Sequence, residues 1–382
     1  MAPDRTDGER TADFRARLVS GIRAVERTEI GPATGVLVFL ATVHLRNLIE
    51  GALERPRLIG FVRDAPVSAL MVLDHFVLFY AALFVVLALS VSAATRFPIR
   101  SVLRVLLAGW VLVLAPPLLD AAFSGGAGFR ITYIPDLARG AAFFDPTRAL
   151  PEVSPGQRLE IAAGLLLVIG YAWAGGAGPL RAAVAGAAFY TVVLLFGALP
   201  VLFARIPFLR GAHLEGLDPV TAVFRSGGIV QHESQKHALL FLFVLLAALG
   251  VLLAKLYPPK AAAVARHLRP LRTMHYAGLA LFGALLGAAM VGPHLGAPAV
   301  ASPIDVLAVA AIVLSVALAF QCAAEWNDIA DLRSDRVNAP DRPLVTRALL
   351  PGDASRLALL YAAGALLLAL NTAHVPFLLV LG

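Results

Sequence analysis

The chain has few of the residues on which disulfide-rich proteins and soluble enzymes depend. Cys322 is the one cysteine in 382 residues, which excludes an intramolecular disulfide and a cluster of thiolate metal ligands. Charged residues make up 15% of the sequence and hydrophobic residues 59%, a composition far more apolar than that of an ordinary globular domain. Residues 1–29 are charged and polar, so we expect no cleavable secretory signal there.

Several motifs that are typical of soluble enzymes are also absent. The sequence contains no Ser/His/Asp arrangement, phosphate-binding glycine loop or dinucleotide fingerprint. His232 and His237 are five residues apart, which misses the i, i+4 spacing of a helical zinc pair. The net charge of +7 would suggest nucleic acid in a soluble protein, but we find no aromatic and basic surface of the kind that single-stranded nucleic acid needs. We therefore expect no nucleic-acid partner.

Long hydrophobic runs dominate what is present, and each is long enough for a membrane helix or nearly so. We predict an all-α, polytopic transmembrane protein with about nine membrane helices. Their approximate bounds are Ile30–Ile49, Val67–Ala94, Val105–Phe123, Leu159–Trp173, Ala182–Phe203, Ala238–Leu256, Tyr276–Val291, Val306–Cys322 and Leu357–Leu381.

The positions of the basic residues predict an orientation in the cell (inner) membrane. Arginines precede the first hydrophobic run, a strong basic cluster spans residues 255–272, and the turn at 292–303 has no Lys or Arg. By the positive-inside rule, the amino terminus and the segment 325–356 are cytoplasmic and the turn at 292–303 is external.

Polar residues in the first half of the chain have two possible roles. Asp74, His75 and Asp120 fall within or near hydrophobic runs, where ionisable groups can form a polar pocket or a proton path. The alternative, which we favour, is that neighbouring helices or water satisfy them structurally. Arg46 and Glu50 are four residues apart and can pair along one helix.

The stretch from Glu325 to Arg347 carries the most distinctive pattern. It follows a hydrophobic run, and a continued helix would place Asn327, Asp328, Asp331 and Asp335 within one arc of roughly 100°. An all-oxygen set of this kind suits Mg²⁺ better than Zn²⁺. The arginines that follow can donate to phosphate oxygens; they are Arg333, Arg336, Arg342 and Arg347. A charged cytoplasmic loop that caps a membrane helix is the simpler alternative.

This stretch resembles the first Asp-rich motif of the UbiA superfamily of intramembrane prenyltransferases. The matching residues are Asn327-Asp328-x-x-Asp331-x-x-x-Asp335, then Asn338, Pro340 and Arg342-Pro343-Leu344. The segment that begins at Arg266 resembles the start of those enzymes, with an Arg-Pro pair that enters a Gly/Ala-rich helix. The resemblance covers residues 260–382. Residues 329 and 330 are Ile and Ala, where the family often has aromatic side chains.

The resemblance implies Mg²⁺-dependent transfer of a prenyl group from an allylic prenyl diphosphate to a lipid or aromatic acceptor. Asp328, Asp331 and Asp335 would be catalytic and would hold Mg²⁺ together with Asn327. Asn327, Arg342 and Arg347 would bind the substrate. The family also carries a second Asp-rich motif several helices later, and only 47 residues follow Asp335 here.

We therefore expect a six-helix membrane domain of unknown function at 1–257 and a partial UbiA-like domain at 258–382. The prolines of Tyr257-Pro258-Pro259-Lys260 mark the boundary between them. The chain is expected to be incomplete as a catalyst, and a separate chain could supply the missing helices. The competing class is a non-enzymatic membrane protein, a transporter or scaffold whose Asp cluster binds a cation or anionic lipid.

Overall fold

The computed structural model describes residues 7–53, 66–126, 129, 133–134, 152–206, 223–224, 229–230, 233–295 and 302–372. These residues form helices and contain no β-strand, so the all-α class is confirmed for the described part of the chain. Predictions for the side chain of Asp74 and for His232 lie outside the described residues.

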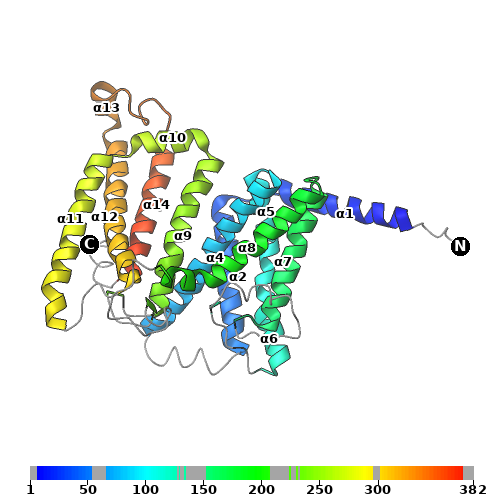
Figure 1. Cartoon of the computed structure of the whole chain (residues 1–382). Helices are drawn as coiled ribbons and strands as arrows, with labels where there is room; N and C mark the ends of the chain where they lie inside the picture. Colours follow the sequence, from blue (N-terminus) through cyan, green and yellow to red (C-terminus); the bar gives the residue numbers. More distant parts are fainter. Residues whose placement is uncertain are drawn as a thin grey trace. The chain divides into compact units, whose positions relative to one another are not determined.

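Figure 1 shows the helices, which are α1 (Asp7–Arg27), α2 (Pro32–Leu53), α4 (Pro66–Thr95), α5 (Ile99–Gly109), η1 (Trp110–Leu114), α6 (Ala115–Ser124), α7 (Pro155–Ala174), α8 (Pro179–Ala204), α9 (Glu233–Leu256), α10 (Pro258–His267), α11 (Pro270–Leu295), α12 (Pro303–Ala330), α13 (Leu332–Asn338) and α14 (Pro351–Leu370).

Seven helical segments in the described ranges are long and apolar enough to cross a bilayer. Two further predicted segments form α7 and α11, which are helical but are not among the seven, so the count of nine stays a prediction. The seven segments are Pro32–Glu50, His75–Thr95, Ile99–Ser124, Pro179–Ala204, Glu233–Leu256, Pro303–Ala330 and Pro351–Leu370.

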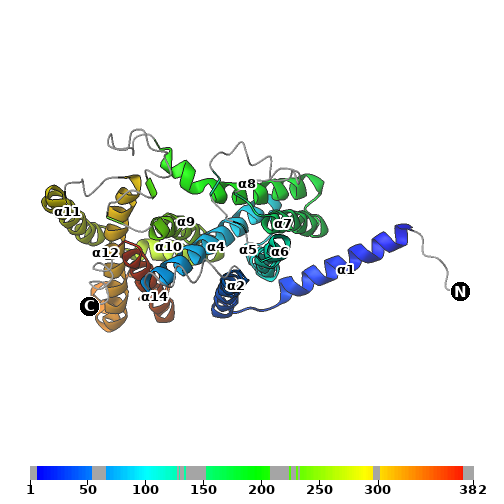
Figure 2. The ribbon, with the colours of Figure 1, turned by 90° about the horizontal axis from the view of Figure 1, so that it is seen from below.

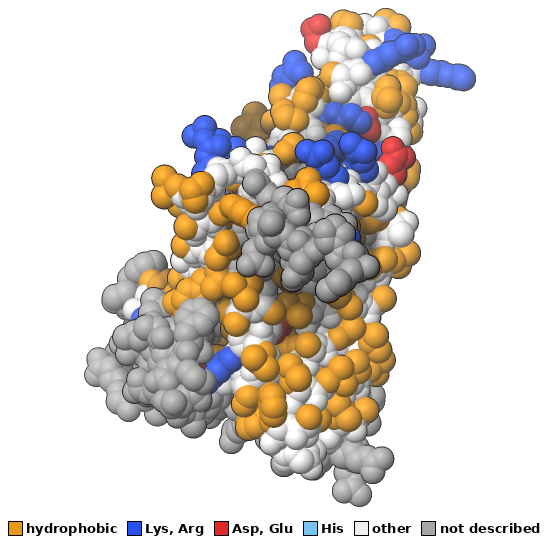
Figure 3. Space-filling model, turned by 90° about the vertical axis from the view of Figure 1, so that its right-hand side faces the viewer, with side chains coloured by type: hydrophobic (Ala, Val, Ile, Leu, Met, Phe, Trp, Pro, Cys, Tyr) orange, Lys and Arg blue, Asp and Glu red, His pale blue; other side chains and the backbone are white. Residues whose placement is uncertain are grey.

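The surface of these segments is rich in large apolar side chains. Leu37, Leu118 and Leu180 are among the exposed ones, as a lipid-facing surface requires. In the face shown in Figure 3, hydrophobic side chains cover much of the described surface and Lys and Arg side chains gather toward its upper part. Both features are those of a multi-pass membrane protein.

The chain divides into two compact units, Met1–Val201 and Leu202–Gly382. Helix α9, which the sequence analysis places before the boundary at 257/258, belongs to the second unit, where it packs with α10, α12 and α14. The predicted boundary at 257/258 rests on the prolines and the family resemblance, whereas the compact units divide at 201/202, within the last turn of α8. The prolines Pro258 and Pro259 end α9 and begin α10 within the second unit.

The first unit contains a span that is broken in its middle. Pro116 and Pro117 have no amide hydrogen, so the carbonyl groups four residues earlier cannot accept the usual α-helical hydrogen bonds. The chain passes from α5 through the 3-10 turn η1 into α6, with both prolines in the first turn of α6. Trp110 of η1 packs against Phe39 and Phe84, with ring centroids 5.5 and 5.0 Å apart. Aromatic packing therefore holds the break in place.

Two charged groups of the first unit pair with groups next to them. Arg46 is buried and pairs with Glu50, as their spacing predicts, at 2.5 Å. Asp120 is buried at the end of α6 and caps the start of α7. Its carboxylate accepts a hydrogen bond from Ser154 Oγ at 2.5 Å and from the backbone N–H of Gly156 at 2.7 Å. These contacts support a structural role for Asp120.

Gly156→Ala should destabilise the first unit. An added β-carbon would lie 2.7 Å from the carbonyl oxygen of Pro116, a backbone atom that cannot rotate away, and overpacking of this kind costs about 1–3 kcal/mol. Gly170→Ala on the same helix is the control, because its β-carbon would meet nothing within 4 Å. We expect a lower thermal unfolding midpoint in detergent for Gly156→Ala. Equal midpoints would contradict the close packing of α6 against α7.

Helix α12 is the centre of the second unit. Figures 1 and 2 show α11 on one side of it and α14 on the other. Ser315 Oγ donates to the carbonyl oxygen of Ala365 in α14 at 2.8 Å, and Gln321 Nε2 donates to Thr273 Oγ1 in α11 at 2.5 Å. Hydrogen bonds between apolar helices fix their rotation about their own axes. They determine which residues at the end of α12 face α10.

The segment between α13 and α14 is anchored by a small apolar cluster, which we call the loop anchor. It consists of Ala263 of α10, Leu344 and Leu349 of the segment itself, and Ala354 of α14, all of them buried. Ile329 and Leu332, on either side of the junction between α12 and α13, pack against it. The loop anchor therefore fixes the backbone on both sides of the polar residues at the end of α12.

The predicted orientation can be tested with single cysteines in a Cys322→Ser background. A cysteine at Ala299, in the turn without Lys or Arg, should react with an impermeant thiol reagent in intact cells. A cysteine at Ser334, which is exposed in α13, should react only after the membrane is permeabilised, because arginines surround it in sequence. The reverse labelling pattern would place the Asp-rich segment outside.

Candidate functional site

The candidate site lies at the end of α12, where α10, α13 and the segment before α14 meet (Figure 1). Helix α10 ends at His267 because Leu268 is extended (φ −54°, ψ 141°), and only two residues separate it from Pro270 at the start of α11. The residue before a proline is disfavoured in helical conformation, so Arg269 also lies in this short connection. His267 and Arg269 are thereby brought beside the end of α12.

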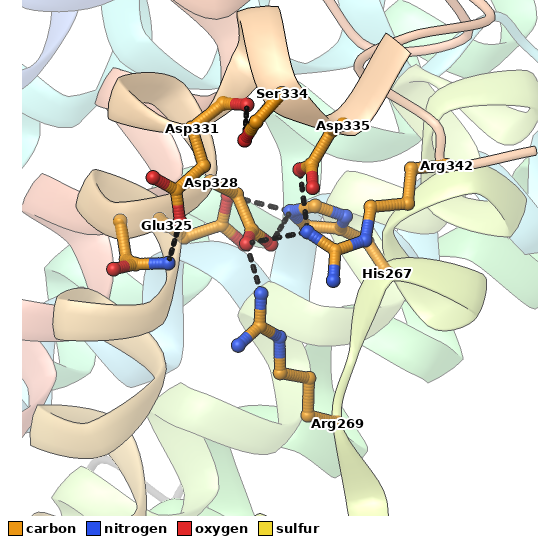
Figure 4. A network of polar contacts seen from close by, with 9 residues as sticks. His267, Arg269, Glu325, Asp328, Asp331, Ser334, Asp335 and Arg342 are labelled. Carbon is orange, nitrogen blue, oxygen red and sulfur yellow. Dashed lines mark hydrogen bonds and ion pairs between the residues drawn. The ribbon is translucent and has the colours of Figure 1, made fainter. Parts of the chain in front are cut away.

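Asp328 is the centre of the site. Its carboxylate is buried, 2% exposed as a residue, although it belongs to the charged end of an apolar helix. Oδ1 accepts from a guanidinium nitrogen of Arg269 and lies 3.3 Å from Nη1 of Arg342, while Oδ2 lies 3.4 Å from Nε2 of His267. Figure 4 shows these groups converging on Asp328 from α10, from the connection to α11 and from the segment after α13.

Arg342 joins Asp328 to a second carboxylate. Its Nη1 donates to Oδ2 of Asp335 at 2.5 Å, and Asp335 is buried in α13. A single guanidinium therefore bridges two of the three predicted metal-binding aspartates. Each hydrogen bond of this bridge joins the guanidinium to a carboxylate, and hydrogen bonds between charged groups are the stronger ones.

Asp331 and Asn327 lie apart from this bridge. The backbone leaves helical geometry at Asp331 (φ −83°, ψ 3°), where α12 ends and α13 begins. Both side chains are exposed, and Asn327 Nδ2 donates to Asp331 Oδ2 at 2.7 Å. The structure thus divides the predicted arc into a buried pair, Asp328 and Asp335, and an exposed pair, Asn327 and Asp331.

Arg347 is the remaining residue that the sequence predicts for substrate binding. It is exposed, and its backbone has a positive φ of 58° in the turn that follows Arg342. Its side chain does not take part in the described contacts around Asp328. Its predicted role in phosphate binding stays a prediction.

Three residues of the site, Arg269, Glu325 and His267, were not predicted from the sequence as site residues. Glu325 and His267 are both buried, and His267 Nε2 lies 3.2 Å from Glu325 Oε2. Neither atom has an aligned hydrogen bond within the described part of the chain. Glu325 precedes Asp328 by three residues and so shares its helix face, a signal that was available in the sequence. Nothing in the sequence brings His267 to that face, because it comes from another helix.

We refer to these six residues as the polar network: His267, Arg269, Glu325, Asp328, Asp335 and Arg342. It contains three carboxylates, two guanidiniums and one imidazole. Burying carboxylates without cationic partners would be strongly unfavourable. The two guanidiniums therefore offset two of the three carboxylate charges.

The fit to Mg²⁺ is incomplete. The carboxylate and amide oxygens are the ligands that Mg²⁺ prefers. However, the described residues contain no group of three or more His, Cys, Asp or Glu side chains arranged to hold a metal. The buried carboxylates face arginines, and the exposed pair is turned away from them. The donor chemistry suits Mg²⁺, and the arrangement does not.

No known family profile, curated protein or solved structure matches this chain.

We expect different costs for removing two neighbouring aspartates. Asp328→Ala should lower the stability of the second unit by about 3–5 kcal/mol, because it breaks a buried ion pair and leaves Arg269 without its carboxylate partner. Asp331→Ala, on the exposed side, should change it by no more than about 0.5 kcal/mol. Thermal unfolding in detergent would compare the two. Similar losses for both variants would contradict the buried position of Asp328.

Proposed function

We propose that the polar network binds the diphosphate group of a prenyl diphosphate, and that the chain takes part in prenyl transfer to a lipid or aromatic acceptor. The observation that carries the proposal is the position of Arg269 and Arg342, two guanidiniums on buried carboxylates at the end of an apolar helix bundle. Both side chains are partly exposed, Arg269 by 20% and Arg342 by 37%. They can therefore reach an anion that approaches from the aqueous side.

The elements next to the network suit the rest of such a ligand. A prenyl diphosphate is an amphiphile, with a charged head and a long hydrocarbon chain. Helices α11 and α12 run from the network into the apolar part of the second unit, and α11 exposes many large apolar side chains along its length, including Leu271, Met274, Leu279 and Phe282. With the diphosphate at the polar network and the hydrocarbon chain along these helices, each part of the ligand would lie in surroundings of its own polarity.

Planar guanidiniums are suited to the head group. Each can donate two parallel hydrogen bonds to phosphate oxygens. Mg²⁺ is the cofactor that the family resemblance implies, and when bound it would neutralise the charge that develops on the diphosphate. In the proposal it enters with the diphosphate, since the network by itself does not present a metal site. The acceptor class, lipid or aromatic, comes from the resemblance alone.

A second candidate function has a specific observation in its favour. The network is already close to neutral, and its arginines alone could hold the phosphate of an anionic lipid without any metal. A transporter or scaffold would need no more than this. The two functions differ in whether binding requires Mg²⁺ and in whether it selects a diphosphate over a single phosphate.

Binding measurements on the purified chain separate the two functions. We expect geranylgeranyl diphosphate to bind in detergent when Mg²⁺ is present, with Asp331→Ala weakening it severely because an exposed oxygen ligand is lost. Asp353→Asn is the control, since Asp353 pairs with Lys260 at the same end of the unit, outside the network. Isothermal titration calorimetry would measure both. Binding that ignores Mg²⁺ and is equally strong for phosphatidic acid would support the lipid-binding alternative instead.

A further inference from the structure

We propose that the first unit binds the phosphate group of an anionic phospholipid at a cluster of arginines, which we call the basic rim. The cluster lies where α1 ends, α4 ends and α5 begins, and it consists of Arg23, Arg27, Arg96, Arg100 and Arg104. The inference is independent of the proposed function, because it concerns the other unit of the chain and involves neither a prenyl diphosphate nor a metal. The ligand is a lipid of the bilayer in which the chain resides.

One tyrosine brings the ends of α1 and α4 together. Tyr171 of α7 donates a hydrogen bond to Glu26 Oε1 in the last turn of α1 at 2.9 Å. The ring of Tyr171 packs against Phe97, with ring centroids 5.3 Å apart. Arg27 follows Glu26 in the sequence and Arg96 precedes Phe97. These two arginines therefore come from distant parts of the sequence to the same end of the first unit.

The start of α5 joins the same place. Arg104 of α5 donates to the backbone carbonyl oxygen of Glu26, and Figures 1 and 2 show the end of α1 beside α5. Arg100 lies one turn from Arg104 on the same face of α5. Arg23 lies in the same relation to Arg27 on α1. All five arginines are therefore at one end of the first unit.

The basic rim lies at the depth of the lipid head groups. The membrane-spanning segment His75–Thr95 ends directly before Arg96, and the segment Ile99–Ser124 begins three residues after it. Side chains at such positions stand at the boundary between the hydrocarbon core and the aqueous phase, where phospholipid phosphates also lie. A lipid phosphate can therefore reach the arginines without leaving its normal depth.

Positive charge exceeds negative charge in the basic rim. Residues 20–30 and 92–109 contain five arginines and two glutamates, and one of the glutamates, Glu26, already accepts the tyrosine hydrogen bond. Arg27 and Arg96 are exposed and form no ion pair within the described part of the chain. Their guanidiniums are therefore available to an anion from outside the chain.

The backbone of Arg96 is a second and independent observation. Its φ is 62°, a left-handed conformation that is unfavourable for any residue with a β-carbon. The position directly follows the last residue of α4, where glycine is the common choice. Strained residues of this kind occur preferentially at ligand sites. An exposed arginine in place of glycine indicates that its side chain has a partner in the membrane.

The apolar surface beside the basic rim suits the acyl chains. Gly35 of α2 lies against α5, since an added β-carbon would be 3.8 Å from Leu107 Cδ2. The next two residues of α2, Val36 and Leu37, are 58% and 66% exposed. Guanidiniums can each donate two parallel hydrogen bonds to a phosphate. A zwitterionic head group carries its own cation, which the arginines would repel, so the site favours an anionic lipid.

The test is native mass spectrometry of the full chain in detergent, titrated separately with dioleoylphosphatidylglycerol and dioleoylphosphatidylcholine. We expect the wild-type chain to bind the anionic lipid at least about fivefold more tightly, because one arginine near a membrane surface contributes about that factor. Arg27→Gln/Arg96→Gln should weaken phosphatidylglycerol binding at least about tenfold and leave phosphatidylcholine binding unchanged. The matched control is Lys255→Gln/Arg356→Gln, which removes the same charge from exposed positions of the second unit and should leave both affinities unchanged.

Arg96→Gly separates a binding role from a structural one. Glycine adopts the left-handed conformation without strain, so in lipid-free detergent this variant should unfold at the wild-type temperature or above it. It should nevertheless bind phosphatidylglycerol about fivefold more weakly. A lower unfolding midpoint together with unchanged lipid binding would assign Arg96 to the fold and overturn the site.

Other results would overturn the site in different ways. Equal weakening by Arg27→Gln/Arg96→Gln and by the control would mean a general attraction of anionic lipid to a basic protein. Equal affinity of the wild-type chain for the two lipids would show that the arginines do not select the head group. Displacement of phosphatidylglycerol by an equal concentration of glycerol 3-phosphate would indicate a site for a soluble phosphate. None of these results bears on the polar network, because no variant in the set alters it.

Discussion

The second unit depends on the neutralisation of carboxylates that are buried at the end of an apolar helix. Asp328 could not remain at 2% exposure in an ionised state without cationic partners. Its partners come from three separate parts of the chain, namely the end of α10, the connection to α11 and the segment after α13. The ion pairs therefore link these segments into one site. Apolar packing in the loop anchor then keeps the segments close enough for the pairs to form.

The first unit meets a similar requirement by different means. Asp120 is buried, but it accepts hydrogen bonds at an N-terminal helix cap. Arg46 pairs with Glu50 of its own helix and lies 5.4 Å from the ring of Tyr80, although its Nε has no hydrogen bond in the described part of the chain. These contacts lie within one helix or at one helix end, whereas the polar network of the second unit joins segments that are far apart in the chain.

The sequence was sufficient for the long apolar helices and for part of the site, but it did not predict the polar helices α1, α10 and α13. Hydrophobic length located α12 and the polar stretch at its end, and the four-residue spacing of Arg46 and Glu50 identified their pairing. It could not show that the backbone turns at Asp331, because an arc computed for a continuous helix assumes that the helix does not end there. The sequence could not place His267 beside Asp328 for a different reason. Their proximity depends on a contact between α10 and α12, which lie far apart in the sequence. The nearness of Arg269 to Asp328 has the same origin.

The loop anchor also has a kinetic consequence. Because Leu344 and Leu349 fix the segment that carries Arg342, a change in the network involves side-chain torsions rather than a loop or domain movement. Rotamer changes of exposed side chains take picoseconds to nanoseconds, whereas loop motions extend to microseconds. The timescale of such a change is therefore that of side-chain rotation.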